Sequence, residues 1–466
     1  METTVEKTIS TLWQKSKLIV KGGIIGLLAL LLMIPMMYVK DLVFERQERQ
    51  KEAISEISSK WAGRQNITGP VVGVPFWQQD SGDTTLRAGI SKHIAWFLPA
   101  SLTVNSVITP MEKHRGIFKV MLYESKTTLA GSFSGLPVDK LNIPPDKFIW
   151  NEAFVKLTIS DVKGLNDQLK IKWNGREIEL SPQSSGSNEG MTALLNATSA
   201  EDFANINFSS SVDLNGSEQL LFTPVGKMTT INLTGEWKHP SFSGNVLPQS
   251  TEVGDKGFKA VWKSMAHKRS YPQQWIDNAY KTDYSSFQPA VQRNEAYERG
   301  GIKTAVITDP FSLTSASSGV DLFIPLNGYQ KTLRTIKYAL LCILLTFAAF
   351  FLVETNQKKS IHPLQYGLVG AALVLFYSLL LSLSEYTGFN TAYFIASAAT
   401  IGLIGWFVKS ILQSGRATAI LSAVLVLVYS YVFGLLQLQD YSLLLGSTGL
   451  FLTLAVIMYF SRKIQW

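Results

Sequence analysis

Residues 366–408 read YGLVGAALVLFYSLLLSLSEYTGFNTAYFIASAATIGLIGWFV, and Glu385 is the only charged residue among them. This glutamate separates two apolar runs, 366–384 and 386–408. A helix of about 17 to 25 mostly apolar residues crosses a bilayer core, so each run predicts one membrane span. The stretch therefore decides the fold class, because it predicts an α-helical membrane protein that crosses the bilayer more than once.

Four further apolar stretches extend this prediction to six spans. Residues 22–39 read GGIIGLLALLLMIPMMYV and carry no charge. The composition agrees, because hydrophobic residues make up 46% of the chain and charged residues only 17%, against about 25% in soluble domains. A five-helix transmembrane bundle is expected over 337–466. The other predicted spans are 338–353, 417–439 and 441–461.

The first span is predicted to be an uncleaved signal anchor. Its apolar run is longer than the stretch of about 7 to 15 residues found in a cleaved signal peptide. Lys40 and Asp41 follow it, where a cleavage site would have small residues. The preceding segment, 1–21, is basic and is expected to be a cytoplasmic tail.

The charges of the short loops predict the orientation in the membrane. Cytoplasmic loops of membrane proteins are enriched in Lys and Arg. In this chain, one set of alternate short loops carries basic residues, and the other set carries only the acidic Glu385 and Asp440. Both chain termini are therefore expected in the cytoplasm, and 40–336 is expected outside as a periplasmic domain. The basic residues of the opposite loops are Lys358, Lys359, Lys409, Arg416, Arg462 and Lys463.

The extracytoplasmic insert is predicted to begin with a helix and to continue as β structure. Residues 42–60 are rich in strong helix formers, which indicates a stalk helix that continues the first span. Short β-favouring runs separated by turn residues follow, without regular amphipathic helices between them. We therefore predict an antiparallel sandwich or a curved open sheet. The predicted strands are 71–77, 93–98, 101–109, 116–124, 127–133, 154–159, 169–173, 206–212, 219–222, 228–236, 258–262, 303–308 and 320–325.

Sequence motifs of catalysis and of metal binding are absent from the chain. Cys342 is the only cysteine, and no phosphate-binding glycine loop, HExxH or GxSxG occurs. The five histidines are scattered, without metal-ligand spacing. The charges of the large insert nearly balance, which argues against a nucleic-acid partner. We expect no enzymatic activity, no cofactor and no nucleic-acid binding, with the lipid bilayer as a partner.

Three polar residues at the ends of predicted spans are candidate site residues. Glu354 ends the second span and His362 opens the third, so the two side chains are expected to pair at the cytoplasmic rim. Glu385 lies between the third and fourth spans, at the opposite rim. Ionisable residues in membrane segments are functional candidates because burying them is costly. At the rim, however, water solvates them, so Glu385 is interpreted first as a hairpin residue and alternatively as a ligand, proton or partner contact.

Several segments resemble the CreD family of bacterial inner-membrane proteins. They are GPVVGVPF (69–76), HPSFSG (239–244), GFKAVW (257–262), IKYALLCILLTFAAFFLVE (336–354) and IHPLQYGLVGAALVLFYSLLLSLSEYTGF (361–389). The resemblance covers most of the chain. It implies a cell-envelope integrity protein of the inner membrane, associated with colicin tolerance and the envelope stress response, but it implies no chemistry.

The sequence leaves three classes of function open. The leading hypothesis is a non-enzymatic envelope protein whose periplasmic β domain binds an envelope protein or lipid. The alternative is a transporter or lipid-handling membrane protein, because six helices accompany a β domain that could shield an acyl chain. A membrane hydrolase is the weakest case, since Glu385 and His362 are predicted on opposite sides of the bilayer. Neither the sequence nor the resemblance indicates the oligomeric state.

Overall fold

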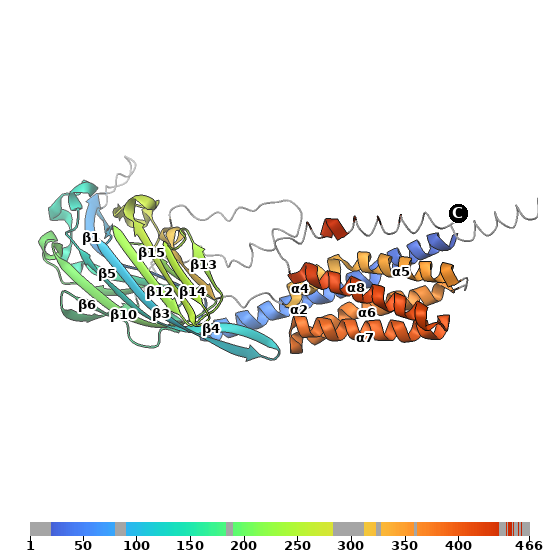
Figure 1. Ribbon diagram of the computed structural model, residues 1–466. Helices are drawn as coiled ribbons and strands as arrows, with labels where there is room; N and C mark the ends of the chain where they lie inside the picture. Colours follow the sequence, from blue (N-terminus) through green and yellow to red (C-terminus); the bar gives the residue numbers. More distant parts are fainter. Residues whose placement is uncertain are drawn as a thin grey trace, which may run out of the picture. The chain divides into compact units, whose positions relative to one another are not determined.

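The computed structural model describes residues 20–79, 90–182, 190–282, 312–322, 328–357 and 361–437, together with single positions between 444 and 458. The chain forms two compact units, which we call the helical unit and the β unit. The helical unit comprises 1–52 and 326–466, and the β unit comprises 53–325. Figure 1 labels the helices and many of the strands of the two units.

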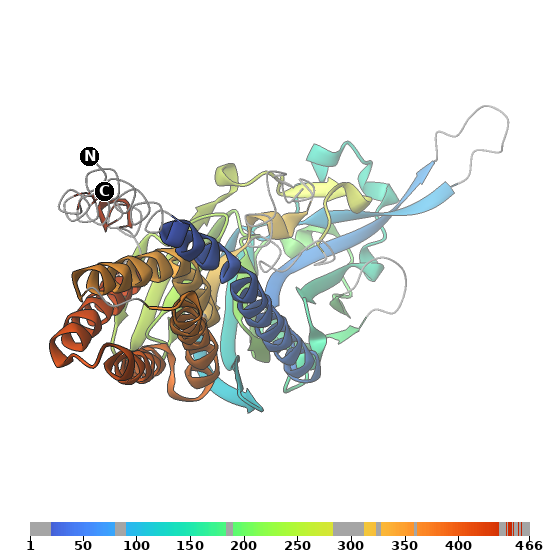
Figure 2. The ribbon, with the colours of Figure 1, turned by 90° about the vertical axis from the view of Figure 1, so that its right-hand side faces the viewer.

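The helical unit is built from long apolar helices that pack side by side. Along the chain, α6 packs on α7 and α7 on α8, while α5 contacts both α6 and α8. Figures 1 and 2 show this grouping from two directions. The helices are α2 (Met33–Trp61), α4 (Gly328–Lys337), α5 (Ala339–Gln357), α6 (Pro363–Thr387), α7 (Phe389–Leu412) and α8 (Gly415–Gln437).

Four helices of the described chain are long and apolar enough to cross a membrane, namely Val20–Trp61, α6, α7 and α8. A fifth candidate arises if α4 and the following Ala339–Thr355, which meet at a bend of 47°, form one span. The predicted span 338–353 corresponds to α5, which begins one residue later. The sixth predicted span, 441–461, lies largely outside the described residues.

The connection between α6 and α7 differs from the expected hairpin. Helix α6 continues through Glu385 and ends at Thr387, and the chain turns at Gly388. Gly388 has a φ of +78°, a conformation that glycine adopts without the steric cost of a Cβ atom. Glu385 is therefore a residue of the last turn of α6 and not of the hairpin.

Small residues of α6 let the N-terminal helix pack closely against it. A Cβ atom on Gly370 would lie 2.1 Å from Cδ1 of Leu32, and one on Gly367 would lie 3.9 Å from the Leu28 side chain. Small residues on a helix surface allow close approach of two membrane helices. Both glycines therefore face the N-terminal helix of the same chain.

The β unit contains two sheets with a shared hydrophobic core. One sheet has the order β13-β17-β11-β1-β5-β9-β8, with β2 paired to β1 and β16 paired to β2. The strands of this nine-stranded sheet are β1 (Gln65–Gln79), β2 (Ile90–Phe97), β5 (Phe154–Ile159), β8 (Ser181–Pro182), β9 (Met191–Leu194), β11 (Gln219–Thr223), β13 (Pro240–Gly244), β16 (Gln274–Ile276) and β17 (Ser318–Leu322).

The second sheet has eight strands in the order β14-β15-β12-β3-β4-β10-β6-β7. Its strands are β3 (Ser101–Arg115), β4 (Phe118–Phe133), β6 (Lys170–Trp173), β7 (Arg176–Glu179), β10 (Ile206–Ser217), β12 (Met228–Gly235), β14 (Ser250–Gly254) and β15 (Gly257–Met265).

The β-rich domain is confirmed, but its sheets are mixed, so the antiparallel pairing expected of a sandwich holds only in part. Strand β1 runs parallel to β11, and β12 runs parallel to β3. Side chains that alternate along each strand enter the core between the sheets, as Leu102 and Val104 do on β3. An aromatic cluster of Phe133, Trp173 and Phe208 packs in the same core.

Several predicted strand boundaries also require correction. The strands expected at 116–124 and 127–133 form one strand, β4. Strand β1 begins at Gln65 and continues through Gly69–Pro70, where its register with β5 shifts. No strand was expected at Pro240–Gly244, which forms β13. The strand expected at 303–308 lies outside the described residues.

Substitution of Gly131 by alanine is expected to destabilise the β unit by about 2 to 3 kcal/mol. A Cβ atom there would lie 2.1 Å from the backbone oxygen of Ser101 on β3, so the strand itself would have to move. Denaturant unfolding of the full chain, followed by tryptophan fluorescence, measures the effect. Gly254→Ala on β14 is the matched control, because a Cβ atom added there would meet no atom within 4 Å. Equal unfolding midpoints for the two variants would contradict the prediction.

Candidate functional site

Glu354 accepts three hydrogen bonds at one end of the helical unit. Its Oε2 accepts from the Tyr366 hydroxyl at 2.7 Å, and its Oε1 accepts from the backbone N–H of Ile361 at 2.9 Å. The Lys21 ammonium group also donates to Oε1, and to the carbonyl oxygen of Ile361 at 2.7 Å. The Glu354 side chain is only 8% exposed. This carboxylate therefore links the N-terminal helix to α5 and to the start of α6.

His362 serves a local structural purpose instead of pairing with Glu354. It is the N-cap of α6, where its Nδ1 accepts the backbone N–H of Leu364 at 3.2 Å. The Gln365 side chain accepts the His362 backbone N–H at 3.1 Å and completes a capping box. Among the described residues, the structure thus brings Glu354 together with Lys21 and Tyr366 and leaves His362 outside this cluster.

Glu385 has partners at the other end of the same helix. The Tyr329 hydroxyl of α4 donates to its Oε1 at 3.0 Å, and Nε of Arg46 on α2 lies 3.8 Å away. The side chain is 9% exposed, so the expectation of a solvated carboxylate is wrong. Glu385 therefore joins α2, α4 and α6 within the chain, and its role as a ligand, proton or partner contact stays a prediction.

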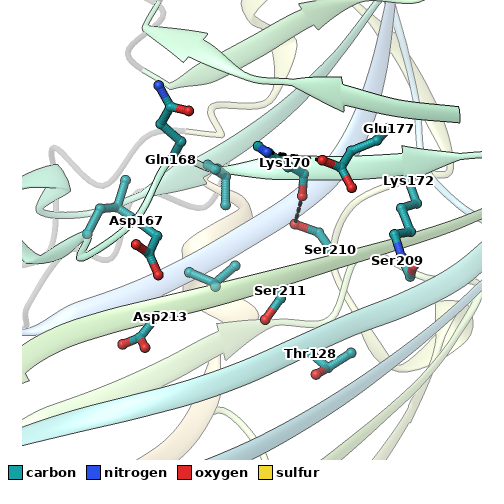
Figure 3. Close-up of a pocket in the computed structure, with 13 residues that line it drawn as sticks. Thr128, Asp167, Gln168, Lys170, Lys172, Glu177, Ser209, Ser210, Ser211 and Asp213 are labelled. Atoms are coloured by element: carbon teal, nitrogen blue, oxygen red, sulfur yellow. Dashed lines mark hydrogen bonds and ion pairs between the residues drawn. The ribbon is translucent and has the colours of Figure 1, made fainter.

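A polar cleft lies on the outer face of the eight-stranded sheet (Figure 3). Its volume is about 420 Å³. Strands β4, β6, β7 and β10 and the loop before β6 supply the walls. The register pairs Ser211 of β10 with Thr128 of β4, so these two side chains share one face of the sheet. The lining residues are Thr128, Leu165, Asp167, Gln168, Leu169, Lys170, Lys172, Glu177, Ser209, Ser210, Ser211, Val212 and Asp213.

The charges of the cleft nearly cancel, and its hydrogen bonds fix part of the wall. Lys170 pairs with Glu177 at 3.1 Å, and the Ser210 hydroxyl donates to the Lys170 carbonyl oxygen at 2.7 Å. Asp213 accepts a hydrogen bond from the side chain of Asn166 at 2.8 Å. Hydroxyl, amide and carboxylate groups line the cleft and no aromatic ring does. It can therefore hydrogen-bond a polar ligand, which sequence motifs could not indicate.

A second arrangement missed by sequence reasoning links β2 to the segment after β16. Nδ1 of His93 lies 2.5 Å from Oδ2 of Asp277, and Nε2 lies 2.6 Å from the Ser91 hydroxyl. Oδ1 of Asp277 accepts the backbone N–H of Ile94 at 2.9 Å. This order of contacts is that of a Ser-His-Asp triad. The sequence does not indicate this arrangement, because Asp277 lies 184 residues after His93.

Asp321 is a partly buried carboxyl group on β17. Its Oδ1 accepts hydrogen bonds from the Gln219 amide at 2.6 Å and from the Ser243 hydroxyl at 2.9 Å. Burial raises the pKa of Asp321 above its usual value, although these hydrogen bonds and the charge of Arg64 oppose the rise. Ionised Asp321 therefore makes the folded state less stable than neutral Asp321 does.

Asp321→Asn is expected to stabilise the β unit at neutral pH by an amount on the order of 1 kcal/mol. The raised pKa contributes stability below the unfolded-state pKa, and this contribution is lost as the pH rises through the folded-state pKa. Asparagine keeps the acceptor oxygen and never ionises, so its advantage should appear at pH about 7 and vanish near pH about 3.5. Melting temperatures at both pH values measure the effect. A less stable variant at neutral pH would contradict this prediction.

No group of three or more His, Cys, Asp or Glu side chains that could hold a metal ion occurs among the described residues.

Comparison with known proteins gives two matches. A family model described as inner membrane protein CreD matches residues 17–466. The chain is also 30% identical over 443 residues to the inner membrane protein CreD of Escherichia coli (strain K12), a match that covers 94% of this chain and 91% of that protein.

Proposed function

Because the chain belongs to the CreD family of inner membrane proteins, we propose that it supports bacterial envelope integrity through binding by its β unit. In this proposal it is a multi-pass protein with six spans and cytoplasmic termini, and 40–336 is periplasmic. The four or five candidate spans and the basic loops support the topology. Reporter proteins fused after Lys358 and after Arg416 should report a cytoplasmic location. A periplasmic signal from the fusion at Arg416 would overturn the proposed topology.

The polar cleft of the eight-stranded sheet is the observation that supports the binding proposal. Its hydroxyl groups lie on strands β4 and β10, whose paired backbones hold them in place before a ligand binds. The ligand is an envelope component, and the cleft acts in a non-enzymatic way.

Filling the cleft tests this proposal. Ser211→Trp should cause envelope leakage and detergent sensitivity in cells while the protein level stays normal, because the indole occupies the ligand space. Val253→Trp is the matched control, since Val253 is an exposed residue of β14 on the same sheet but outside the cleft. Cells with Ser211→Trp that resist detergent as well as the control would refute a role of the cleft.

A transporter or lipid-handling protein is less well supported by the helical unit. Within the described part of the chain, the buried polar residues of α5 and α7 include Thr346, Ser397 and Thr400, whose hydroxyls donate to backbone oxygens of their own helices. Glu354 and Glu385 lie near the ends of their helices. Ion-coupled carriers use ionisable groups near the middle of the membrane, and the described helices place none there.

A hydrolase is the second candidate function, favoured by the Ser91, His93 and Asp277 contacts. In a triad, the histidine would take the Ser91 proton as the hydroxyl attacks a carbonyl carbon. A fluorophosphonate probe decides between the two functions. Labelling of the full chain that disappears in Ser91→Ala and weakens in Asp277→Asn would establish the hydrolase, whereas an unlabelled chain supports the non-enzymatic proposal.

A further inference from the structure

An exposed basic surface lies at the end of the eight-stranded sheet where β12 begins and β15 ends. Met228 and Met265 are register partners there, and they are 61% and 47% exposed. The backbone N–H of Ala266 donates to the carbonyl oxygen of Lys227 at 2.9 Å, so the two chain segments stay together beyond the strands. Figure 1 shows β12 beside β15. The surface, named the Lys–Met patch, comprises Lys227, Met228, Lys263, Met265, His267 and Lys268.

Register and alternation place the patch on one side of the sheet. Lys263 lies two residues before Met265 on β15, so the two side chains project to the same face. Thr229, next to Met228 on β12, is buried on the opposite face. The methionines and Lys263 therefore form one outward surface, and Lys227 and Lys268 extend it at the strand ends.

The lysines of the patch have no acidic partner among the residues that the structure describes. Lys227, Lys263 and Lys268 are exposed, and none forms an ion pair with a residue that the structure describes. The segments 219–235 and 257–276, which carry the patch, contain no Asp or Glu. Other lysines of the same sheet are paired, as Lys119 is with Glu112 and Lys170 with Glu177. The patch therefore offers a local positive charge to an anionic partner.

The residue types favour a lipid surface over a protein surface. Protein interfaces are enriched in Arg and aromatic residues and depleted in Lys. Long lysine side chains adapt to the mobile phosphates of an anionic bilayer and attract them electrostatically. Flexible methionine side chains supply the apolar area that interfacial binding adds to charge attraction. Lysine and methionine side chains together therefore suit a bilayer surface, where anionic headgroups lie above acyl chains.

We infer that the Lys–Met patch binds the surface of an anionic lipid bilayer. The ammonium groups of Lys227, Lys263 and Lys268 contact headgroup phosphates, and Met228 and Met265 lie among the upper acyl-chain carbons. The inference rests on the proposed exposure of the β unit outside the membrane but not on the polar cleft, whose lining shares no residue with the patch. Loss of cleft function and loss of lipid binding can therefore be separated by variants.

Vesicle binding by the full chain tests the inference. The chain is placed in nanodiscs of phosphatidylcholine and floated with vesicles of either phosphatidylcholine or equal parts phosphatidylcholine and phosphatidylglycerol. We expect flotation with the anionic vesicles only, and its loss at high salt. The triple variant Lys227→Gln, Lys263→Gln, Lys268→Gln should lower vesicle partitioning on the order of a hundredfold, because each lysine contributes about fivefold near an anionic surface.

Two further variants separate the patch from general charge effects. Met228→Ser with Met265→Ser should weaken binding and leave its salt dependence unchanged. The control triple Lys119→Gln, Lys126→Gln, Lys259→Gln removes the same charge from the same sheet outside the patch and should bind as the unaltered chain does. Equal losses in the two lysine triples, or binding to polyglutamate in place of anionic vesicles, would overturn the inference.

Discussion

Glu354→Ala is expected to destabilise the helical unit by about 3 to 5 kcal/mol, because breaking a buried ion pair leaves its partner charge uncompensated. The substitution removes the acceptor for the Lys21 ammonium group, the Tyr366 hydroxyl and the Ile361 backbone N–H. Tyr366 is fully buried against Phe347 and Phe350, so its hydroxyl finds no water as a substitute partner. Unfolding of the detergent-solubilised chain in increasing dodecyl sulfate measures the loss.

The other end of α6 supplies the matched control. Glu385→Ala removes one hydrogen bond, from Tyr329, and a more distant charge contact with Arg46, whose side chain is 38% exposed and can be rehydrated. The free energy of unfolding should fall by only about 1 kcal/mol in Glu385→Ala. Replacing both members of the buried pair, as in Lys21→Met with Glu354→Leu, should recover most of the stability. Equal losses for the two single alanine variants would contradict this account.

The helices were largely predictable from sequence because their hydrophobic signal is local. The run 366–384 corresponds to α6 and 386–408 to α7, within a few residues at each end. The error at Glu385 arose because a charge was taken as the end of a helix. Contacts with Tyr329 and Arg46 allow Glu385 to remain within the helix, and both partners are too remote in sequence to be recognised.

The strands were harder to delimit because polar residues enter the core of the β unit. Ser125 and Lys126 interrupt the apolar pattern of β4 and so suggested two strands, the second beginning at Thr127. Ser125 donates to the Leu214 carbonyl oxygen at 3.1 Å, and Thr127 pairs with Ser106 at 2.8 Å, so the alternation continues through them. Parallel pairing of β1 with β11 joins residues far apart in the chain, which periodicity does not reveal.

The candidate site was predictable in part. Glu354 was recognised as a rim residue from its position at the end of an apolar run, but Lys21 was not recognised as its partner. The pairing with His362 was expected because both residues were predicted at the cytoplasmic rim, whereas backbone capping at the start of α6 uses that imidazole. The polar cleft combines residues of four strands and a loop, so its existence depends on strand order. Tertiary contacts thus decide which polar residues act together.

The β unit is expected to fold when it is produced as residues 53–325, whereas residues 69–325 are expected to stay unfolded. The longer segment retains the whole of β1, including Gln65 to Thr68, which pair with Leu220 to Thr223 of β11. Far-ultraviolet circular dichroism and cooperative thermal unfolding distinguish the outcomes. A helix-dominated spectrum for the longer segment would refute its expected β structure.

The four residues at the start of β1 matter because β11 depends on them for its place in the sheet. In the sheet order, β1 connects β11, β17 and β13 to the remaining strands, so the shorter segment loses that connection. Gln65 is fully buried, and its amide nitrogen donates to the backbone oxygens of Asp161 at 2.9 Å and Asn215 at 3.0 Å. Ile67 is buried in the core, and loss of such a side chain alone costs about 2 to 5 kcal/mol.

Together these losses approach the whole stability of a domain, about 5 to 15 kcal/mol, so the shorter segment should lack a cooperative transition. Residues 62–325 provide the control, because this segment lacks the end of α2 and retains β1. It loses the exposed pair of Glu56 with Arg115, a contact of small energetic value, and should unfold cooperatively. If 69–325 melts at the same temperature as 62–325, the start of β1 does not hold β11 in the sheet.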